Sequence, residues 1–202
     1  MGRNKEFDTT QTLYKAMKVF GQYGYEGTSL QQLLDQLGIA RQSLYDTYGT
    51  KRGLFVSALS RYIDEKNSEV VRILSESPSV REALTIMFEQ TVEVLQEPEL
   101  YNECYIVNSA VEQAPLDPEI ARIVEASTVL LEEAHYRALL RAREQGELPP
   151  DAYPDEKLRS LARYLHHTRM SLVFTARSGA DPQTLQDIAR VTLSVLDWGT
   201  GT

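Results

Sequence analysis

The stretch "LGIARQSLYDTYGTKRGLF", residues 37–55, decides the fold of the N-terminal part of the chain. Its first glycine, Gly38, ends one amphipathic helix, and Gly49 with Thr50 separates the next helix from a long one. That next helix is very short, about residues 40–47, and its exposed face is polar. The segment is cationic and rich in hydrogen-bonding groups, whereas the whole chain has a formal net charge of −8.

Two amphipathic helices are expected around this turn. Apolar residues with helical spacing, followed by Gly24 as a left-handed stop, predict the first; they are Leu13, Ala16, Met17 and Phe20. Thr28 or Ser29 can cap the second, in which the same spacing is formed by Leu30, Leu33, Leu34 and Leu37. Two short helices joined by a glycine-containing turn are typical of a helix-turn-helix, whose second helix enters the major groove of DNA.

The polar side chains of the short helix are expected to face outward, because Leu44 points inward. Arginine can fork onto guanine O6/N7 and glutamine onto adenine N6/N7, whereas hydroxyls, lysines and the N–H groups at a helix start can meet phosphates. An ordinary polar turn between two amphipathic helices remains an alternative at this point. The predicted DNA contacts are Thr28, Ser29, Arg41, Gln42, Ser43, Tyr45 and Lys51.

The rest of the chain is also predicted to be helical, since no strand-like alternation interrupts the helical spacing. Asp117 and Asp181 each stand directly before a proline, the combination expected for an N-cap and a first helical turn. The fold class is therefore all-α, with about nine helices in total. Beyond residue 50 the expected helices cover residues 51–75, 80–96, 99–113, 118–145, 155–177 and 182–197.

Charge is unevenly distributed along the chain. Residues 1–54 hold seven Lys/Arg and five Asp/Glu, a balance of +2, which leaves −10 for the remainder of a chain of net charge −8. A small positive end on an acidic body fits a protein that contacts nucleic acid with one end only. The 42% hydrophobic content is enough for a sizeable core.

Composition also excludes several classes of protein. No apolar run approaches the roughly 20 residues that cross a bilayer, and the start Met-Gly-Arg-Asn lacks the apolar region of a signal peptide, so we expect a cytoplasmic protein without a membrane partner. Cys104 is the only cysteine, which excludes an internal disulfide and a cysteine-based zinc site. His166 and His167 are adjacent and point about 100° apart on a helix, so no metal site is expected.

Some dozen positions between residues 7 and 55 form one pattern without a gap: Ala16, Phe20, Gly24, Thr28, Leu37-Gly38-Ile39, Ser43-Leu44-Tyr45, Tyr48, Lys51 and Leu54-Phe55. This pattern resembles the N-terminal signature of the TetR/AcrR family of bacterial transcriptional regulators. The resemblance implies a helix-turn-helix DNA-binding domain at residues 1–50 and a helical ligand-binding and dimerisation domain at residues 51–202. It also implies a repressor that is released from DNA by a small-molecule inducer.

The resemblance assigns roles within the predicted DNA contacts and shows two departures. It implies base reading by Arg41, Gln42 and Ser43, and phosphate contacts by Thr28, Tyr45 and Lys51. Ser29 is a candidate only through its own hydroxyl and N–H group at the start of its helix. Ala40 stands where the family often has Ser or Thr, so the recognition helix lacks a side-chain cap. Asp46 stands where His or Asn is frequent, and a carboxylate near phosphates is repelled unless it accepts from cytosine N4 or pairs with Arg41 or Arg52.

Apolar stripes on the last two helices carry the prediction of a homodimer. By themselves such stripes favour intrachain core, but the resemblance implies dimerisation through these helices as a four-helix bundle. A symmetric dimer also allows two DNA-binding domains, or heads, to read a near-palindromic operator in double-stranded DNA. The stripe residues are Leu158, Leu161, Ala162, Leu165, Leu172, Val173, Ala176, Leu185, Ile188, Ala189, Leu193 and Leu196.

The middle helices contain aromatic and polar residues that could line an inducer pocket, although each could also belong to ordinary helical core. A rival interpretation is a small helical ligand-binding protein or enzyme that uses this pocket and has a vestigial head. Nothing near Cys104 suggests catalysis, so we predict no enzyme, no catalytic residue and no cofactor; a redox role of its thiol stays open. The pocket candidates are Phe88, Tyr101, Cys104, Tyr105, Asn108, Tyr136, Tyr164, His167, Met170 and Phe174.

Overall fold

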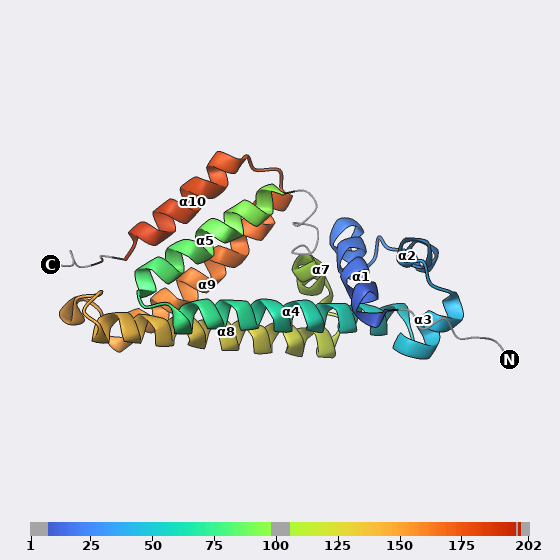
Figure 1. Cartoon of the computed structure of the whole chain (residues 1–202), viewed down its shortest axis with the longest axis horizontal. Coiled ribbons are helices and arrows are strands. Elements are labelled where there is room, and N and C mark those ends of the chain that lie inside the picture. The colour runs from blue at the N-terminus through green and yellow to red at the C-terminus, as the bar shows by residue number, and fades with distance from the viewer. Residues whose placement is uncertain (1–7, 98–105, 197, 199–202) are drawn as a thin grey trace. The chain divides into compact units, whose positions relative to one another are not determined.

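The computed structural model describes residues 8–97, 106–196 and 198, and over these residues it is all-helical (Figure 1). This confirms the predicted fold class of about nine helices. Within the described residues, no helix is both long and apolar enough to cross a membrane. The nine α-helices described are α1 (Thr9–Tyr23), α2 (Leu30–Leu37), α3 (Arg41–Tyr48), α4 (Lys51–Glu76), α5 (Val80–Gln96), α7 (Ile106–Gln113), α8 (Pro118–Glu144), α9 (Asp155–Arg177) and α10 (Pro182–Ser194), with a 3₁₀ turn η1 at Pro150–Ala152.

The predicted helix ends agree closely with the structure for several helices. α5 and α9 have the predicted bounds, and the carboxylate of Asp181 caps α10 by accepting from the Thr184 N–H at 2.8 Å. α10 ends at Ser194, earlier than predicted, and η1 was not predicted. The first part of the helix predicted at residues 99–113 lies outside the described residues.

The chain divides into two compact units, and their described residues are 8–64 and 106–124 in the first and 65–97, 125–196 and 198 in the second. The first unit thus contains α7 and the start of α8 together with the helix-turn-helix. The predicted functional division at residue 50 is a different kind of boundary, and it stays a prediction.

One hydrophobic cluster holds the first unit together. Phe20 and Phe55 meet edge to face at 5.0 Å between ring centroids, and Tyr25 packs against both rings. α1 packs against α2 and α7, so residues far apart in sequence share this core. Its buried members are Ala16, Met17, Val19, Phe20, Leu33, Leu34, Leu37, Leu44, Leu54, Phe55, Ala58, Leu59, Tyr62, Ile63, Ala110 and Ile120.

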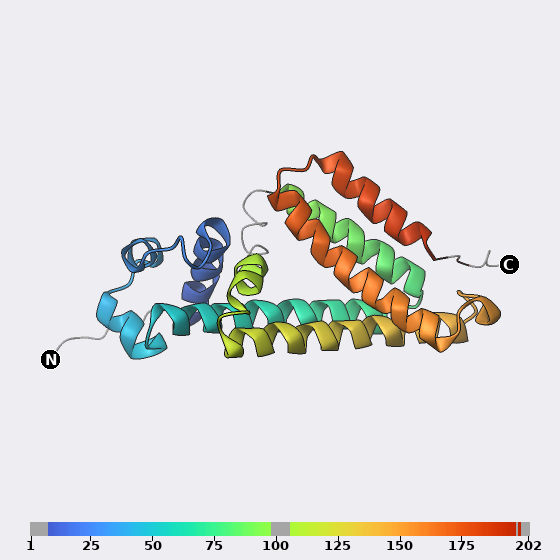
Figure 2. The same cartoon turned by 180° about the vertical axis from the view of Figure 1, so that it is seen from behind.

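In the second unit, α10 packs on α5 and α9, and α5 packs on α9 (Figure 2). The turn between α4 and α5 is held from the end of α8. The Arg141 guanidinium donates to the carbonyls of Leu74, Ser75 and Ser77 at 2.8, 2.7 and 3.0 Å. The Glu147 carboxylate accepts from the first N–H groups of α5, so one segment closes both helix ends at this turn.

Candidate nucleic-acid interface

The position of α3 follows from one buried residue and one glycine. Gly38 adopts the left-handed conformation, with φ of 68°, and its N–H closes α2 on the Leu34 carbonyl. Leu44 is fully buried in the core of the first unit, and it is the buried residue of α3. As predicted, Ala40 at the N-cap makes no side-chain hydrogen bond. The helix is therefore held by its inner face alone.

The residues predicted to read bases lie on the outer side of α3. Arg41 and Gln42 are exposed, Tyr45 is 41% exposed, and Ser43 is half-buried. The helix also exposes Asp46, which accepts a hydrogen bond of 2.6 Å from the Gln42 side-chain amide. The four base-reading and phosphate candidates on α3 are thus presented together, with a carboxylate among them.

The two candidates at the start of α2 have different surroundings. Ser29 is exposed and is the N-cap, since its hydroxyl accepts from the Gln32 N–H at 3.1 Å. Thr28 is fully buried, and its hydroxyl donates to the Gly24 carbonyl at 2.6 Å. Its side chain therefore fastens the α1–α2 turn. The phosphate contact predicted for Thr28 stays a prediction.

Lys51 begins α4 close to an aromatic ring. Its ammonium nitrogen lies 4.4 Å from the ring centroid of Tyr25, within the range of a cation–π contact. Burial lowers the pKa of Lys51 from its ordinary value of 10.5, and the charge of Glu26 opposes that shift. The face of the ring thus holds the ammonium group at the start of α4.

Arg52, the next residue, has a different role. Its guanidinium donates to both carboxylate oxygens of Asp117, at 2.5 and 2.8 Å, and to Glu119 at 2.7 Å. The hydrogen bonds from Arg52, with those from the first N–H groups of α8, lower the pKa of Asp117 to about 2. Arg52 is thus paired with α8 rather than with Asp46. Sequence reasoning missed this ion pair because its partners are 65 and 67 residues apart.

The ten pocket candidates have unequal surroundings. Tyr101, Cys104 and Tyr105 lie outside the described residues, and so do the ideas that involve the Cys104 thiol. Asn108 is half-buried in the first unit. In the second unit, Phe88 and Tyr136 are buried and Met170 is half-buried. The side chains of Tyr164, His167 and Phe174 are exposed.

Two histidines of the second unit are buried, and sequence reasoning did not select either of them. His135 is fully buried, and its Nδ1 lies 2.7 Å from the Leu131 carbonyl, while His166 is 3% exposed. Their ring centroids are 6.1 Å apart. Burial lowers the pKa of His135 to about 4 and that of His166 to about 3. By contrast, His167 is exposed and meets Glu132 at 3.0 Å, as the divergence of adjacent side chains predicts.

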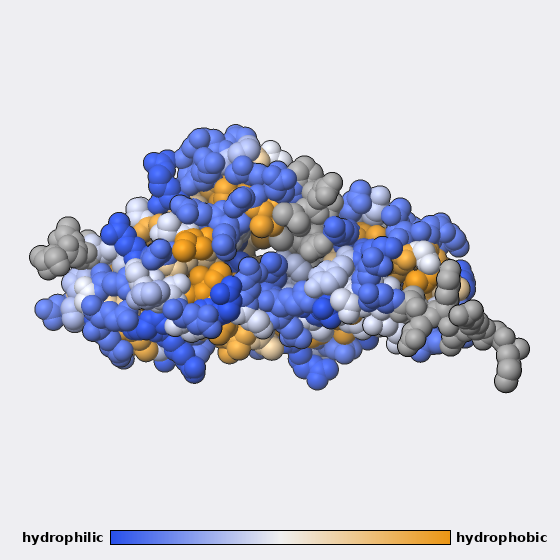
Figure 3. All heavy atoms as spheres, viewed as in Figure 1, coloured by the Kyte–Doolittle hydropathy of each residue, from blue (hydrophilic) through white to orange (hydrophobic). Residues whose placement is uncertain are grey.

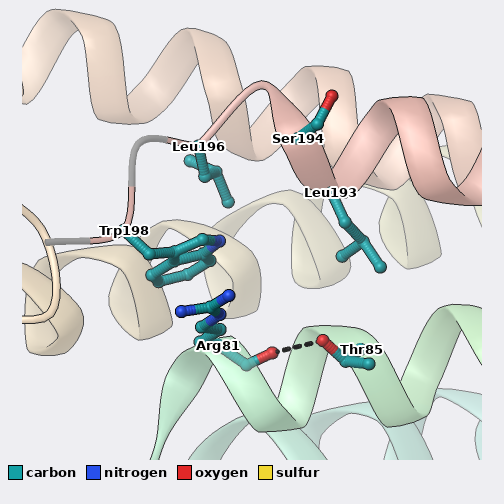
Figure 4. Close-up of a pocket in the computed structure, with 6 residues that line it drawn as sticks. All are labelled: Arg81, Thr85, Leu193, Ser194, Leu196 and Trp198. Atoms are coloured by element: carbon teal, nitrogen blue, oxygen red, sulfur yellow. Dashed lines mark hydrogen bonds between the residues drawn. The ribbon is translucent and has the colours of Figure 1, made fainter. Parts of the chain in front are cut away.

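A pocket of about 370 Å³ lies between the start of α5 and the end of α10 (Figure 4). The Arg81 side chain points toward the Trp198 ring, and the Thr85 hydroxyl donates to the Arg81 carbonyl at 2.9 Å. Of the pocket candidates that the structure describes, none lines it. The lining residues are Arg81, Thr85, Leu193, Ser194, Leu196 and Trp198.

The apolar stripes of α9 and α10 are divided between core and surface. Most of the predicted stripe is buried within the chain, including Leu158, Leu165 and Leu185. A second group of apolar side chains, on the same two helices and at the residue that follows α10, is exposed, and we call it the apolar set. Figure 3 shows one face of the molecule, where separate apolar patches interrupt a hydrophilic surface. The apolar set consists of Tyr164, Phe174, Val191 and Val195.

Comparisons with known proteins identify the same N-terminal region. A sequence model described as "Bacterial regulatory proteins, tetR family" matches residues 13–58. The chain is 55% identical over 197 residues to the HTH-type transcriptional regulator YezE of Bacillus subtilis (strain 168), which is described as uncharacterised; the match covers 98% of this chain and 100% of YezE. It is 31% identical to the HTH-type transcriptional repressor ComR of Escherichia coli (strain K12), over 95% of this chain and 90% of ComR.

Solved structures agree with this likeness. A cysteine-substituted form of the TetR-family regulator CifR, in complex with 26-bp double-strand operator DNA, superposes with a TM-score of 0.81 at 26% identity. The match covers 96% of this chain and all of the CifR chain. The likeness thus extends from the helix-turn-helix to the C-terminal helices.

Proposed function

Since the chain belongs to the TetR family of bacterial regulatory proteins and is a DNA-binding transcriptional regulator, we propose that it acts as a homodimeric repressor that a small-molecule inducer releases from its operator. The observation that carries the proposal is the outer side of α3, where Arg41 and Gln42 are exposed on a helix whose inner face buries Leu44 in the core. The proposed function places the protein in the cytoplasm, where bacterial DNA lies.

In this proposal Arg41 and Gln42 of α3 read bases, and Tyr45 together with residues outside α3 positions the DNA-binding domain on the duplex. Arg41 forks onto a guanine and Gln42 pairs with an adenine, each in the major groove. Tyr45, Ser29 and Lys51 contact phosphates, which fixes the register without reading sequence. The ordered N-cap of α2 and the ring beneath Lys51 support these assignments, because both groups are already oriented.

Dimerisation through α9 and α10 is supported by the apolar set. Phe174 is 66% exposed and Val191 is 56% exposed, although both belong to helices that already bury one face within the chain. A second copy of these helices would remove such side chains from water, and burying apolar surface is favourable at about 25 cal/mol per Å². Two heads then read two half-sites of a near-palindromic operator.

The inducer pocket is proposed among the middle helices. Phe88 and Tyr136 supply buried aromatic surface in the second unit, and the guanidinium of Arg159 lies 3.9 Å from the Tyr136 ring centroid. Small-molecule sites combine apolar lining with a few directed polar groups. An inducer must bind the two states of the repressor with different affinity, because equal affinity would shift nothing.

Electrophoretic mobility shift with the DNA upstream of the protein's own gene tests the proposal. We expect full-length protein to retard this fragment, with affinity that falls as salt rises. The double variant Arg41→Ala plus Lys51→Ala should lose retardation. Lys66→Ala plus Arg72→Ala also removes one lysine and one arginine charge, from a half-buried and an exposed position of the second unit, and should retain retardation. Equal loss in both variants would show a general charge effect and would contradict the assigned interface.

A further inference from the structure

The middle of the outer face of α3 carries a carboxylate. At about 100° per residue, Gln42 and Asp46 each lie about 160° around the helix axis from the buried Leu44, on either side of the direction opposite to it. Both are exposed. These two side chains therefore point most directly away from the core, while Arg41 and Tyr45 lie to one side. DNA phosphates repel a carboxylate in this position, so Asp46 weakens binding unless it meets a donor.

The hydrogen bond between these side chains fixes the direction of the Gln42 amide. Its Nε2 donates to Oδ1 of Asp46 at 2.6 Å. In the reversed amide, the Gln42 oxygen would face the carboxylate and be repelled by it. The amide thus keeps its nitrogen toward Asp46 and its oxygen away. Gln42 offers a base edge one donor and one acceptor in a fixed order, which is what bidentate recognition of adenine requires.

On this basis, and resting on the proposed DNA-binding function, we infer that Asp46 is a specificity-determining residue for the operator. It acts in two ways. It orients Gln42, and its own oxygens accept only from a base amino group in the major groove, cytosine N4 or adenine N6. Guanine and thymine present acceptors at the corresponding edges and are repelled. Asp46 therefore lowers affinity for DNA in general and leaves affinity for one class of half-site, a form of selection against wrong partners.

The chain contains a matched pair that serves as a control. On α2, Gln31 donates from its side-chain amide to Asp35 at 2.9 Å, with the same spacing of four residues. Asp35 is exposed, like Asp46. The two pairs share chemistry and exposure and differ in their helix. Asp35→Asn removes the same charge from the same compact unit without touching α3.

The experiment is selection from duplexes with a randomised centre, using full-length wild type, Asp46→Asn, Asp46→Ala and Asp35→Asn. Each chain is then titrated with the wild-type selected duplex and a scrambled one. We expect wild type to select an amino-bearing base at one position of each half-site. Both Asp46 variants should lose preference there by roughly 5- to 150-fold and bind scrambled DNA more tightly. Asp46→Asn should also reduce base preference at the position read by Gln42. An asparagine side chain can donate as well as accept, so it can pair with the Gln42 amide in either orientation.

Three results would overturn the inference. The first is selection of the wild-type sequence by Asp46→Asn with unchanged preference at every position. The second is a loss of preference in Asp35→Asn as large as that in Asp46→Asn. Either result leaves the proposed DNA-binding function intact and removes the role of Asp46. A wild-type chain that selects no sequence overturns the proposed function itself. Circular dichroism of each variant verifies that the helices are retained.

Discussion

The outer side of α3 and the apolar set on α9 and α10 are both exposed, but they differ in chemistry. α3 presents a guanidinium, an amide and a phenol above a single buried leucine. The apolar set presents two aromatic rings and two valines from helices that already bury Leu165 and Leu185 within the chain. Exposing polar groups to water costs little free energy, because water satisfies their hydrogen bonds. Covering exposed apolar side chains with a partner lowers the free energy, because it removes apolar surface from water. Each face thus suits one partner, DNA for α3 and a second copy for the apolar set.

Charging the apolar set should have the largest effect. Val191→Asp places a carboxylate in the proposed dimer interface, so we expect monomers in analytical ultracentrifugation and operator affinity reduced by about 10²- to 10⁴-fold, the gain that two linked sites provide. Val111 on α7 is 56% exposed, as Val191 is, and Val111→Asp is the matched control. If Val191→Asp stays dimeric, the apolar set is not the interface.

Acid should destabilise the interior of the second unit, where two histidines are buried. In the unfolded chain His135 and His166 bind protons below about pH 6.5, whereas burial lowers their folded-state pKa values to about 4 and about 3. The contribution of the two histidines to the free energy of unfolding should therefore be fully present above pH 6.5. It should fall as pH decreases to about 4, by about 1.4 kcal/mol per pH unit for each histidine.

Urea unfolding at pH 7, 6 and 5 measures this slope, and His166→Phe should roughly halve it. The pKa of Asp117 is lowered to about 2, so its contribution is lost only below its ordinary value of 3.8 and does not overlap this window. A stability that stays constant from pH 7 to pH 5 would mean that the two imidazoles are not buried as neutral groups.

Arg41→Lys should change base preference while keeping the charge of α3. Lysine cannot form the planar fork that arginine places on guanine, so discrimination at one base pair should fall by about 5- to 150-fold. Affinity for scrambled DNA should change little. Fluorescence anisotropy with duplexes substituted at each position makes the measurement. An equal loss at every position would assign Arg41 to phosphates instead.

The smallest effect is expected at Lys51. Lys51→Met keeps an unbranched side chain over the Tyr25 ring and removes the charge, so the salt slope of binding should decrease by about one without a change in base preference. Lys15→Met removes a charge from an exposed position of α1 for comparison. A change of preferred sequence in Lys51→Met would show that this lysine reads bases.

Helices were predictable from the sequence where capping residues and glycines coincide with apolar spacing. Gly24 and Gly38 end α1 and α2 as expected, because both positions need a positive φ. The contact between Gln42 and Asp46 was also within reach, since side chains four apart meet on a helix. For Asp46 the sequence left open a cytosine N4 of DNA or a pairing within the chain with Arg41 or Arg52, and the described structure pairs Asp46 with Gln42.

Contacts between residues distant in sequence could not be predicted from periodicity. The ion pair of Arg52 with Asp117 and the approach of His135 to His166 both depend on how helices pack. Periodicity gives the buried face of a helix but not the helix that covers it. The same limit explains the stripes of α9 and α10, in which apolar spacing alone could not separate residues of the core from those of the apolar set.

The hydrogen bonds from Arg141 and Glu147 to the α4–α5 turn form late during synthesis of the chain. Arg141 and Glu147 are made more than sixty residues after the backbone groups that they bind. While the chain leaves the ribosome, the last carbonyls of α4 and the first amides of α5 therefore have only water as a partner. This corner of the molecule becomes stable only when residue 147 has emerged, so truncated chains that end before it should expose an unfinished hairpin to proteases.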